Sequence, residues 1–292
     1  MRVPTVPTVE RTAAIAGAGP AGLLAAVMLA QRGWQRVDVF DALPPPPAAA
    51  DPSWGVGERS YQLGLNGRGQ YALRQFGCME RVDRFAASVR GRLALSPDAP
   101  PAETVFKDPG TPGAEKSYVT RVLQRDRLQA VLLEEVAERY PQVRIEHNVC
   151  CTGIDLAGDC PALRLAPADA DGAGASGPER LFQADLLIGA DGVRSAVRDA
   201  LAESDGTRVT RYVDDNERVY KTLPLHPSRV AGTRSDLNWG SRNASLGIGM
   251  DALPTKVARA LLDPRARTAR VHGHSCVTCS LLTCTRRARW LR

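Results

Sequence analysis

Two glycine-rich turns contain the residues best suited to chemistry, and the first lies near the N-terminus. It reads Gly17-Ala18-Gly19-Pro20-Ala21-Gly22, which is a G-x-G-x-x-G spacing. In such a turn the first glycine permits a tight bend, the second admits a pyrophosphate, and the third lets a helix pack closely. Asp41 follows at the end of an apolar segment, where its carboxylate can accept hydrogen bonds from a ribose. The spacing predicts a dinucleotide site formed by Gly17, Gly19, Pro20, Ala21, Gly22 and Asp41.

The elements that must position this turn are also visible in the sequence. Residues 13–16 are small and apolar and predict a buried strand, while residues 37–40 predict a second strand. Between them lies an apolar helical segment that Gly33 is expected to end. The order of strand, glycine turn, helix and strand favours a ligand site over a purely structural turn. Free N–H groups at the start of the helix would face the phosphates.

The second glycine turn is Gly189-Ala190-Asp191-Gly192, between an apolar strand at 186–188 and a following helix. Asp191 offers a carboxylate, and Gly192 keeps the backbone open to a ligand. An ordinary turn with a helix-capping aspartate is the alternative interpretation. Residues 184–198, which include Ser195 and Arg198, resemble the Asp-Gly motif of FAD-dependent aromatic monooxygenases of the para-hydroxybenzoate hydroxylase type.

Shorter matches resemble the kynurenine 3-monooxygenase branch of that family. They are Arg59-Ser60, Arg68-Gly69, Ala72-Leu73 and Tyr220-Lys221-x-Leu223, while Arg125-x-x-Leu128 resembles the Arg-x-x-Leu pattern of the wider family. The resemblance implies that Arg59 and Arg125 approach the flavin. It also implies that Arg90 or Arg92 meets the carboxylate of the substrate. No side chain is assigned as a catalytic acid, base or nucleophile, and His147 and His226 are interpreted as ordinary strand or loop residues.

The resemblance implies FAD as cofactor, NADPH or NADH as reductant, and hydroxylation of a small aromatic substrate with dioxygen. It covers about residues 12–255 and lacks the third motif of the family, Gly-Asp-Ala-x-His. The chain is therefore expected to be truncated at its C-terminus, and whether it is an active enzyme is left open. Two alternatives are an inactive or incomplete FAD-binding fragment and a non-hydroxylating flavoprotein oxidoreductase of the same fold.

The expected fold class is α/β, a Rossmann-like FAD-binding fold with a doubly wound sheet and part of a second, substrate-side β-sheet. Four prolines at 44–47 predict an extended connection, and apolar spacing predicts a helix from about Gln124 to Pro141. A shorter helix at 67–76 is expected to use Tyr71, Leu73 and Phe76 as apolar anchors. The predicted parts are an extension at 1–11, an FAD-binding domain at 12–205 with inserted strands at about 76–117, the start of the substrate-side sheet at 206–255, and a basic, atypical, disordered tail at 256–292.

Composition limits the classes of partner. The chain has 292 residues, of which 43% are hydrophobic, and no apolar run reaches the ~20 residues that cross a bilayer. Its formal charge is +6, but nine Lys or Arg and only one acid follow residue 255. The body therefore shows no basic surface for nucleic acid, and RNA binding through the tail is a distant alternative.

The number and spacing of the cysteines indicate a reducing compartment and predict no metal centre. Seven irregularly spaced cysteines favour reduced thiols inside the cell, in the cytoplasm or an organelle. Cys276-x-x-Cys279 lacks a second pair of ligands, so no metal site is predicted.

Overall fold

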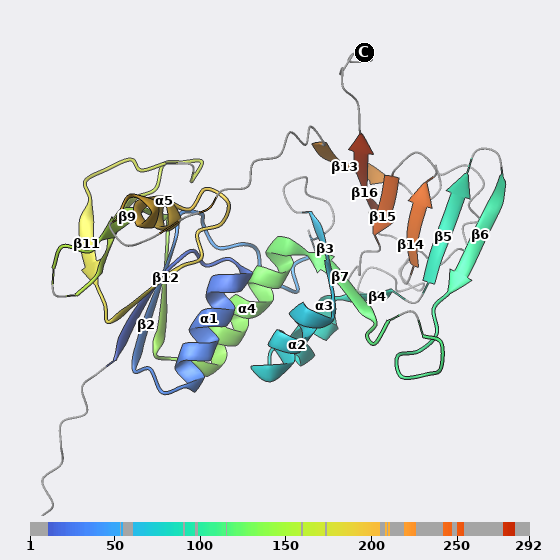
Figure 1. Ribbon diagram of the computed structural model, residues 1–292, viewed down its shortest axis with the longest axis horizontal. Coiled ribbons are helices and arrows are strands. Elements are labelled where there is room, and N and C mark those ends of the chain that lie inside the picture. Colours follow the sequence, from blue (N-terminus) through green and yellow to red (C-terminus); the bar gives the residue numbers. More distant parts are fainter. Residues whose placement is uncertain are drawn as a thin grey trace, which may run out of the picture. The chain divides into compact units, whose positions relative to one another are not determined.

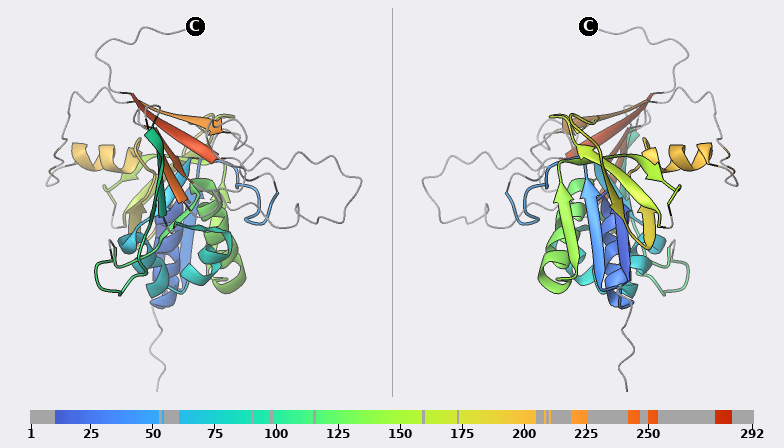
Figure 2. Two further views of the ribbon diagram at one scale, coloured as in Figure 1. Left: turned by 90° about the vertical axis from the view of Figure 1, so that its right-hand side faces the viewer. Right: turned by 90° about the vertical axis from the view of Figure 1, so that its left-hand side faces the viewer.

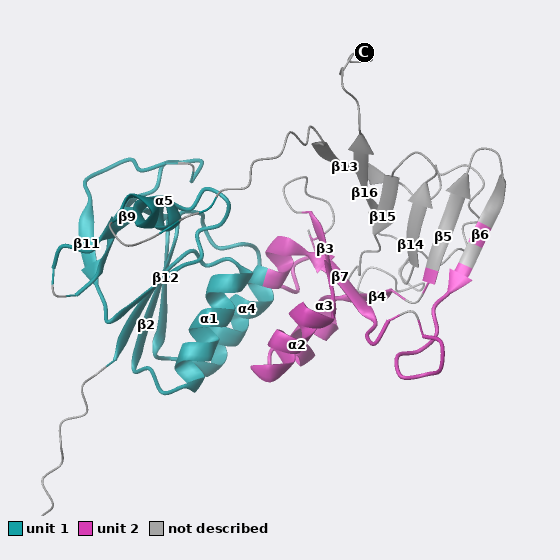
Figure 3. Cartoon of the chain, in the orientation of Figure 1, with its two compact units in different colours: residues 1–47, 129–211 teal, residues 48–128, 212–292 magenta. Residues whose placement is uncertain are grey.

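The chain divides into two compact units, Met1–Pro47 with Gln129–Arg211 and Ala48–Leu128 with Tyr212–Arg292 (Figure 3). The sequence suggested an FAD-binding domain over 12–205 with inserted strands at about 76–117, and in the structure residues 48–128 group with residues 212–292. The computed structural model describes residues 11–52, 54, 61–89, 91–96, 99–114, 116–158, 160–172, 174–204, 208, 210, 219–225, 242–246, 250–253 and 277–283.

Unit 1 is built on a parallel sheet with the strand order β12-β1-β2-β8 (Figure 1). Ala16 pairs in register with Phe40 on one side and with Gly189 on the other. Because these strands run in the same direction, the turns that follow them emerge at one edge of the sheet. The predicted α/β fold is confirmed. The strands are β1 (Thr12–Ala16), β2 (Arg36–Asp41), β8 (Val143–His147) and β12 (Leu186–Gly189).

Helix α1 (Pro20–Gln31) covers one face of this sheet and contacts β1, β2 and β8. Its buried residues include Leu23 and Val27, and they meet the side chains that alternate toward this face, such as Ile15. Residues 129–139 of α4 (Arg125–Arg139) lie beside α1 (Figures 1 and 2). The predicted helix is confirmed there, because its apolar residues at helical spacing are buried.

An antiparallel sheet, in the order β11-β10-β9, packs on the opposite face. Ala14, Ala16 and Phe40 of the parallel sheet form one buried cluster with side chains of this second sheet and of α5 (Ala196–Glu203). The rings of Phe40 and Phe182 meet edge to face with centroids 4.9 Å apart. Unit 1 is therefore layered as helices, parallel sheet and antiparallel sheet. The strands of the second sheet are β9 (Val149–Asp155), β10 (Ala162–Pro167) and β11 (Arg180–Gln183).

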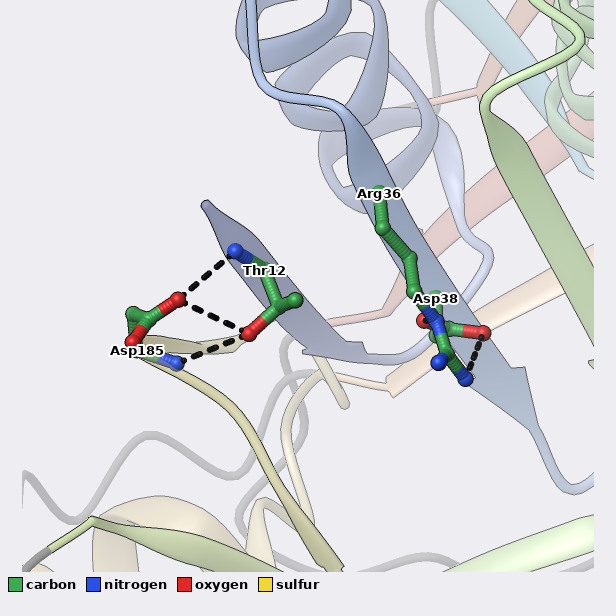
Figure 4. Close-up of polar contacts among 4 residues, drawn as sticks. All are labelled: Thr12, Arg36, Asp38 and Asp185. Atoms are coloured by element: carbon green, nitrogen blue, oxygen red, sulfur yellow. Dashed lines mark hydrogen bonds and ion pairs between the residues drawn. The ribbon is translucent and has the colours of Figure 1, made fainter. Parts of the chain in front are cut away.

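Polar contacts at the amino ends of the strands fix the register of β1 against β12 (Figure 4). The backbone N and Oγ1 of Thr12 donate to Oδ2 of Asp185 at 2.7 and 2.9 Å. These hydrogen bonds hold the pKa of Asp185 below its ordinary value. Nearby, Nε of Arg36 donates to Oδ2 of Asp38 at 2.7 Å, so the buried carboxylate in β2 is paired.

Unit 2 contains helices α2 (Gly67–Gln75) and α3 (Met79–Phe85) and two sheets. The smaller sheet, ordered β3-β7-β4, comprises β3 (Gln62–Leu65), β4 (Ala87–Val89) and β7 (Thr120–Gln124). The larger sheet has the order β13-β16-β15-β14-β5-β6. It therefore combines strands from residues 76–117 with strands from residues 206–255. These strands are β5 (Gly91–Ser96), β6 (Ala99–Val105), β13 (Val219–Leu225), β14 (Arg242–Leu246), β15 (Met250–Leu253) and β16 (Val277–Thr283).

Two features of unit 2 differ from expectation. Seven residues of the C-terminal tail form β16, which pairs with β13 and β15; the rest of the tail lies outside the described residues. The anchor predicted at Tyr71 is wrong, since this residue is 62% exposed, whereas the anchor predicted at Leu73 is buried. Buried Gln70 also holds α2, because its Nε2 donates to the carbonyls of Leu65 and Val119, each at 2.8 Å.

No helix in the part of the chain that the structure describes is both long enough and apolar enough to span a membrane.

Leu165→Ala is expected to destabilise unit 1 by about 2–5 kcal/mol, because Leu165 is fully buried between the two sheets and a cavity would remain. Leu181→Ala on the neighbouring β11 is the matched control. Leu181 is 57% exposed, and its loss should change the free energy of unfolding by less than about 0.5 kcal/mol. Urea unfolding of both variants measures the difference, and equal losses would contradict the layered packing.

Candidate dinucleotide-binding site

The first glycine turn connects β1 to α1 and depends on the absence of side chains. Gly17 has a φ of +100°, and its N–H donates to the carbonyl of Phe40 at 2.7 Å. A Cβ on Gly22 would collide with the carbonyl oxygen of Gly17 and lie 3.1 Å from its carbonyl carbon. Both glycines therefore let α1 begin directly against the end of β1.

The two glycine turns lie against each other. A Cβ on Gly17 would lie 2.7 Å from the carbonyl carbon of Ala190 and 2.9 Å from the nitrogen of Asp191. The N–H of Ala190 also donates to the carbonyl of Ala16 at 2.7 Å. The structure thus brings Gly17, Gly22 and Asp191 together at the carboxyl edge of the parallel sheet.

The N-terminus of α1 presents backbone donors that no side chain caps. Gly19 is the N-cap residue, Pro20 opens the helix, and the first turn contains no acidic residue. N–H groups in the first turn of a helix lack intrahelical partners, and the helix dipole adds partial positive charge there. This end of α1 is suited to the phosphates of a dinucleotide.

The N-terminus of α5, in contrast, is already capped. The Oγ of Ser195 accepts from the N–H of Arg198 at 2.9 Å, and Oδ2 of Asp191 accepts from the N–H of Val197 at 3.2 Å. The structure therefore shows a capped turn, in which Ser195 is the N-cap residue and Asp191 accepts a hydrogen bond from a second N–H of the helix. The other oxygen of Asp191, Oδ1, is buried and lacks a hydrogen-bond partner in the structure. A donor from a bound ligand would satisfy it.

Asp41 lies at the end of β2 beside the first turn. Its Oδ2 accepts from the N–H of Ala18 at 2.7 Å, and its Oδ1 accepts from the N–H of Leu43 at 2.9 Å. Each carboxylate oxygen has a second lone pair, so both can still accept from the hydroxyls of a ribose. Sequence reasoning missed these two backbone donors, which orient the carboxylate before any ligand arrives.

Four arginines were expected at the flavin and the substrate, and the structure describes only part of this set. Arg125 belongs to unit 2, where its Nη1 donates to Oδ1 of the adjacent Asp126 at 2.8 Å. Arg59 and Arg90 lie outside the described residues, and Arg92 lies on β5 with its side chain undescribed. The roles of these four residues stay predictions.

The charge of Asp191 contributes to the raised pKa values of two cysteines of β9. Burial raises the pKa of Cys151 to about 11, and the charge of Asp191 adds to this effect. The pKa of Cys150 is also raised, by burial and then by the charges of Asp169 and Asp191. Neither thiol is poised to act as a nucleophile. Among the described residues, no three or more His, Cys, Asp or Glu gather as metal ligands.

A glycine turn, an uncapped helix start and an acid at the end of the second parallel strand together define a dinucleotide-binding α/β fold. Residues 10–214 match the family described as FAD binding domain. The chain belongs to this family of FAD-binding domains.

Curated relatives support the resemblance seen in the sequence. The chain is 29% identical over 247 residues to the kynurenine 3-monooxygenase of Salinispora arenicola, a match covering 82% of this chain and 44% of the relative. It is 30% identical over 234 residues to that of Xanthomonas euvesicatoria, covering 80% and 46%. The likeness to kynurenine 3-monooxygenases is confirmed, and the chain spans less than half the length of these relatives.

Solved structures show the same fold at low sequence identity. The p-nitrophenol 4-monooxygenase of Pseudomonas putida matches with a TM-score of 0.59 and 14% identity, over 96% of this chain and 59% of that one. The flavin-dependent monooxygenase PieE, solved with FAD and substrate, matches with a TM-score of 0.62 and 17% identity, over 97% and 44%.

Gly17→Ala is expected to destabilise the chain by more than about 2 kcal/mol, because a positive φ and a backbone collision both oppose the new Cβ. Gly33→Ala is the control, since Gly33 has a φ of +81° but nothing within 4 Å of the added Cβ. Denaturant unfolding should show a smaller loss for Gly33→Ala. The same loss in both variants would mean that the two turns do not contact each other.

Cys151 should react slowly with iodoacetamide, because a thiol with a pKa near 11 is protonated throughout pH 7–9. Exposed Cys160 provides the comparison within the same protein. Peptide mapping after timed alkylation should find Cys160 modified first, and the labelling of Cys151 should increase as the pH rises toward 11. Rapid modification of Cys151 at pH 7 would contradict the burial of this strand.

Proposed function

We propose that the chain binds FAD for the NAD(P)H- and O2-dependent hydroxylation of an aromatic substrate. The observation that carries this proposal is the contact between the two glycine turns, which places an uncapped helix start and two carboxylates at one edge of the sheet. The family match supports FAD as the ligand. The names of the relatives support an aromatic hydroxylation.

Different residues of unit 1 would bind different parts of such a cofactor. Asp41 would accept from the ribose of the adenosine half, and the first turn of α1 would meet the pyrophosphate. Oδ1 of Asp191, which lacks a partner in the structure, would accept from a hydroxyl on the flavin side. When bound, the flavin supplies the redox chemistry with the nicotinamide and with dioxygen. The chain binds the cofactor, orients it and keeps water away.

Arg59 and Arg125 are proposed to approach the flavin, and Arg90 or Arg92 the carboxylate of the substrate. Val89, which directly precedes Arg90, lines a pocket in unit 2. The ammonium of Lys116 lies 5.9 Å from the ring of Phe106 and 5.7 Å from the ring of Tyr118, and all three residues line that pocket.

A second candidate function is FAD binding without turnover. It concerns the 292 residues taken by themselves, which span 44% of the length of the Salinispora arenicola relative. A flavoprotein oxidoreductase that does not hydroxylate would be a third outcome. The three functions differ in whether FAD is retained, whether NAD(P)H is consumed, and whether a hydroxylated product forms.

The purified 292-residue chain is expected to retain about one FAD, measured by flavin absorbance and protein concentration. Asp41→Asn should weaken FAD binding about tenfold or more, because a charge-assisted hydrogen bond to a ribose would be weakened. Asp199→Asn, in the adjacent helix α5, is the control and should bind FAD like the wild type.

Consumption of NADPH or NADH with kynurenine as the trial substrate, together with a hydroxylated product, would establish the full proposal. FAD retention without consumption would establish the second candidate. A chain that neither retains nor binds FAD would overturn both.

A further inference from the structure

The carboxylate of Asp41 depends on the short turn that follows β2. Its Oδ1 is held by the N–H of Leu43, which immediately precedes the four prolines of the extended connection. The side chain of Leu43 is 48% exposed, so its own packing fixes the turn only in part. Because Oδ2 is already held by the N–H of Ala18, it is the placement of Oδ1 that depends on what else holds the backbone at residues 42 and 43.

His147 supplies one such contact from the neighbouring strand. It is the in-register partner of Asp41 in the parallel pair of β2 and β8. Its Nδ1 lies 3.0 Å from the carbonyl oxygen of Leu43. Because a carbonyl only accepts, Nδ1 must bear the hydrogen. Leu43 thus accepts a hydrogen bond from His147 through its carbonyl and donates one to Asp41 through its N–H.

The loop between β10 and β11 supplies the second contact. Gly172, with a φ of +64°, lies so close to the turn that an added Cβ would be 3.2 Å from the carbonyl oxygen of Ala42 and 2.5 Å from Cδ2 of Leu43. This loop is tied to the end of β8, because the N–H of Ala168 donates to the carbonyl of Asn148 at 2.9 Å. Asn148 directly follows His147 and has a φ of +61°.

We propose that His147 and the loop at 168–175 position the Asp41 carboxylate and so set the selectivity of the site for an adenosine ribose. The inference rests on the proposed dinucleotide function. His147 acts through the backbone of Leu43 and is a positioning residue. Sequence reasoning set this histidine aside because its value lies in its register opposite Asp41, which only strand pairing reveals.

The test uses the chain after its bound FAD has been removed and compares ADP with 2′,3′-dideoxy-ADP, which differ only in the hydroxyls that Asp41 would bind. The wild-type chain should prefer ADP by at least about tenfold, the value of a charge-assisted hydrogen bond. His147→Phe keeps a ring but removes the donor, and most of this preference should disappear. His147→Asn places an amide donor near the position of Nδ1 and should restore it. In the Asp41→Asn background, His147→Phe should change the preference no further.

Gly172→Ala tests the second contact with His147 intact, and Gly33→Ala is its matched control at an unobstructed positive φ. The first variant should reduce the preference for ADP, and the second should leave it unchanged. Circular dichroism and thermal unfolding show whether each variant is folded.

The outcomes separate the inference from the function on which it rests. If His147→Phe and Gly172→Ala weaken both nucleotides equally, or leave the preference at its wild-type value, the inference is overturned. If the wild-type chain binds neither nucleotide, the proposed function itself fails. Loss of the preference in both variants, with rescue by His147→Asn, supports the inference.

Discussion

The parallel pairing of β1 with β2 on one side and β12 on the other is the constraint on which the rest of unit 1 depends. Every residue of β1 after Thr12 is wholly buried, and three of the four are alanines. Short side chains let a helix pack on one face and a second sheet on the other. The same pairing places two distant turns so close together that Gly17 has no room for a Cβ beside Ala190.

The two helices that leave this edge differ in how their first turns are satisfied. The N-terminus of α5 is closed by Ser195 and Asp191, whereas that of α1 has only a glycine and a proline. The backbone N–H groups at the two helix starts thus differ in availability. In α5 they donate to side chains of the preceding residues, whereas in α1 they have no side-chain acceptor. A negatively charged group is accordingly better accommodated at α1 than at α5.

Local patterns were sufficient to predict much of unit 1. The run from β1 to Asp41 and the helix α4 follow from apolar spacing and from glycine and proline positions, all of which are short-range signals. Contacts between distant segments were not predictable in this way. The backbone donors to Asp41 come from turn geometry, and the place of His147 comes from strand register. The prediction that Tyr71 anchors α2 was wrong because the polar residue Gln70 takes the buried position, where its side chain donates to two carbonyls.

The distance along the chain between β1 and β12 has a consequence for biosynthesis. Thr12 and Asp185, which hydrogen-bond to each other, are 173 positions apart. At about 5–20 residues per second, a ribosome would need roughly 9–35 s to reach Asp185 after it has added Thr12. During that interval one edge of an apolar strand has no native neighbour, and such edges recruit other chains. The nascent polypeptide is therefore open to such contacts until β12 has been made, and the two glycine turns can meet only after that point.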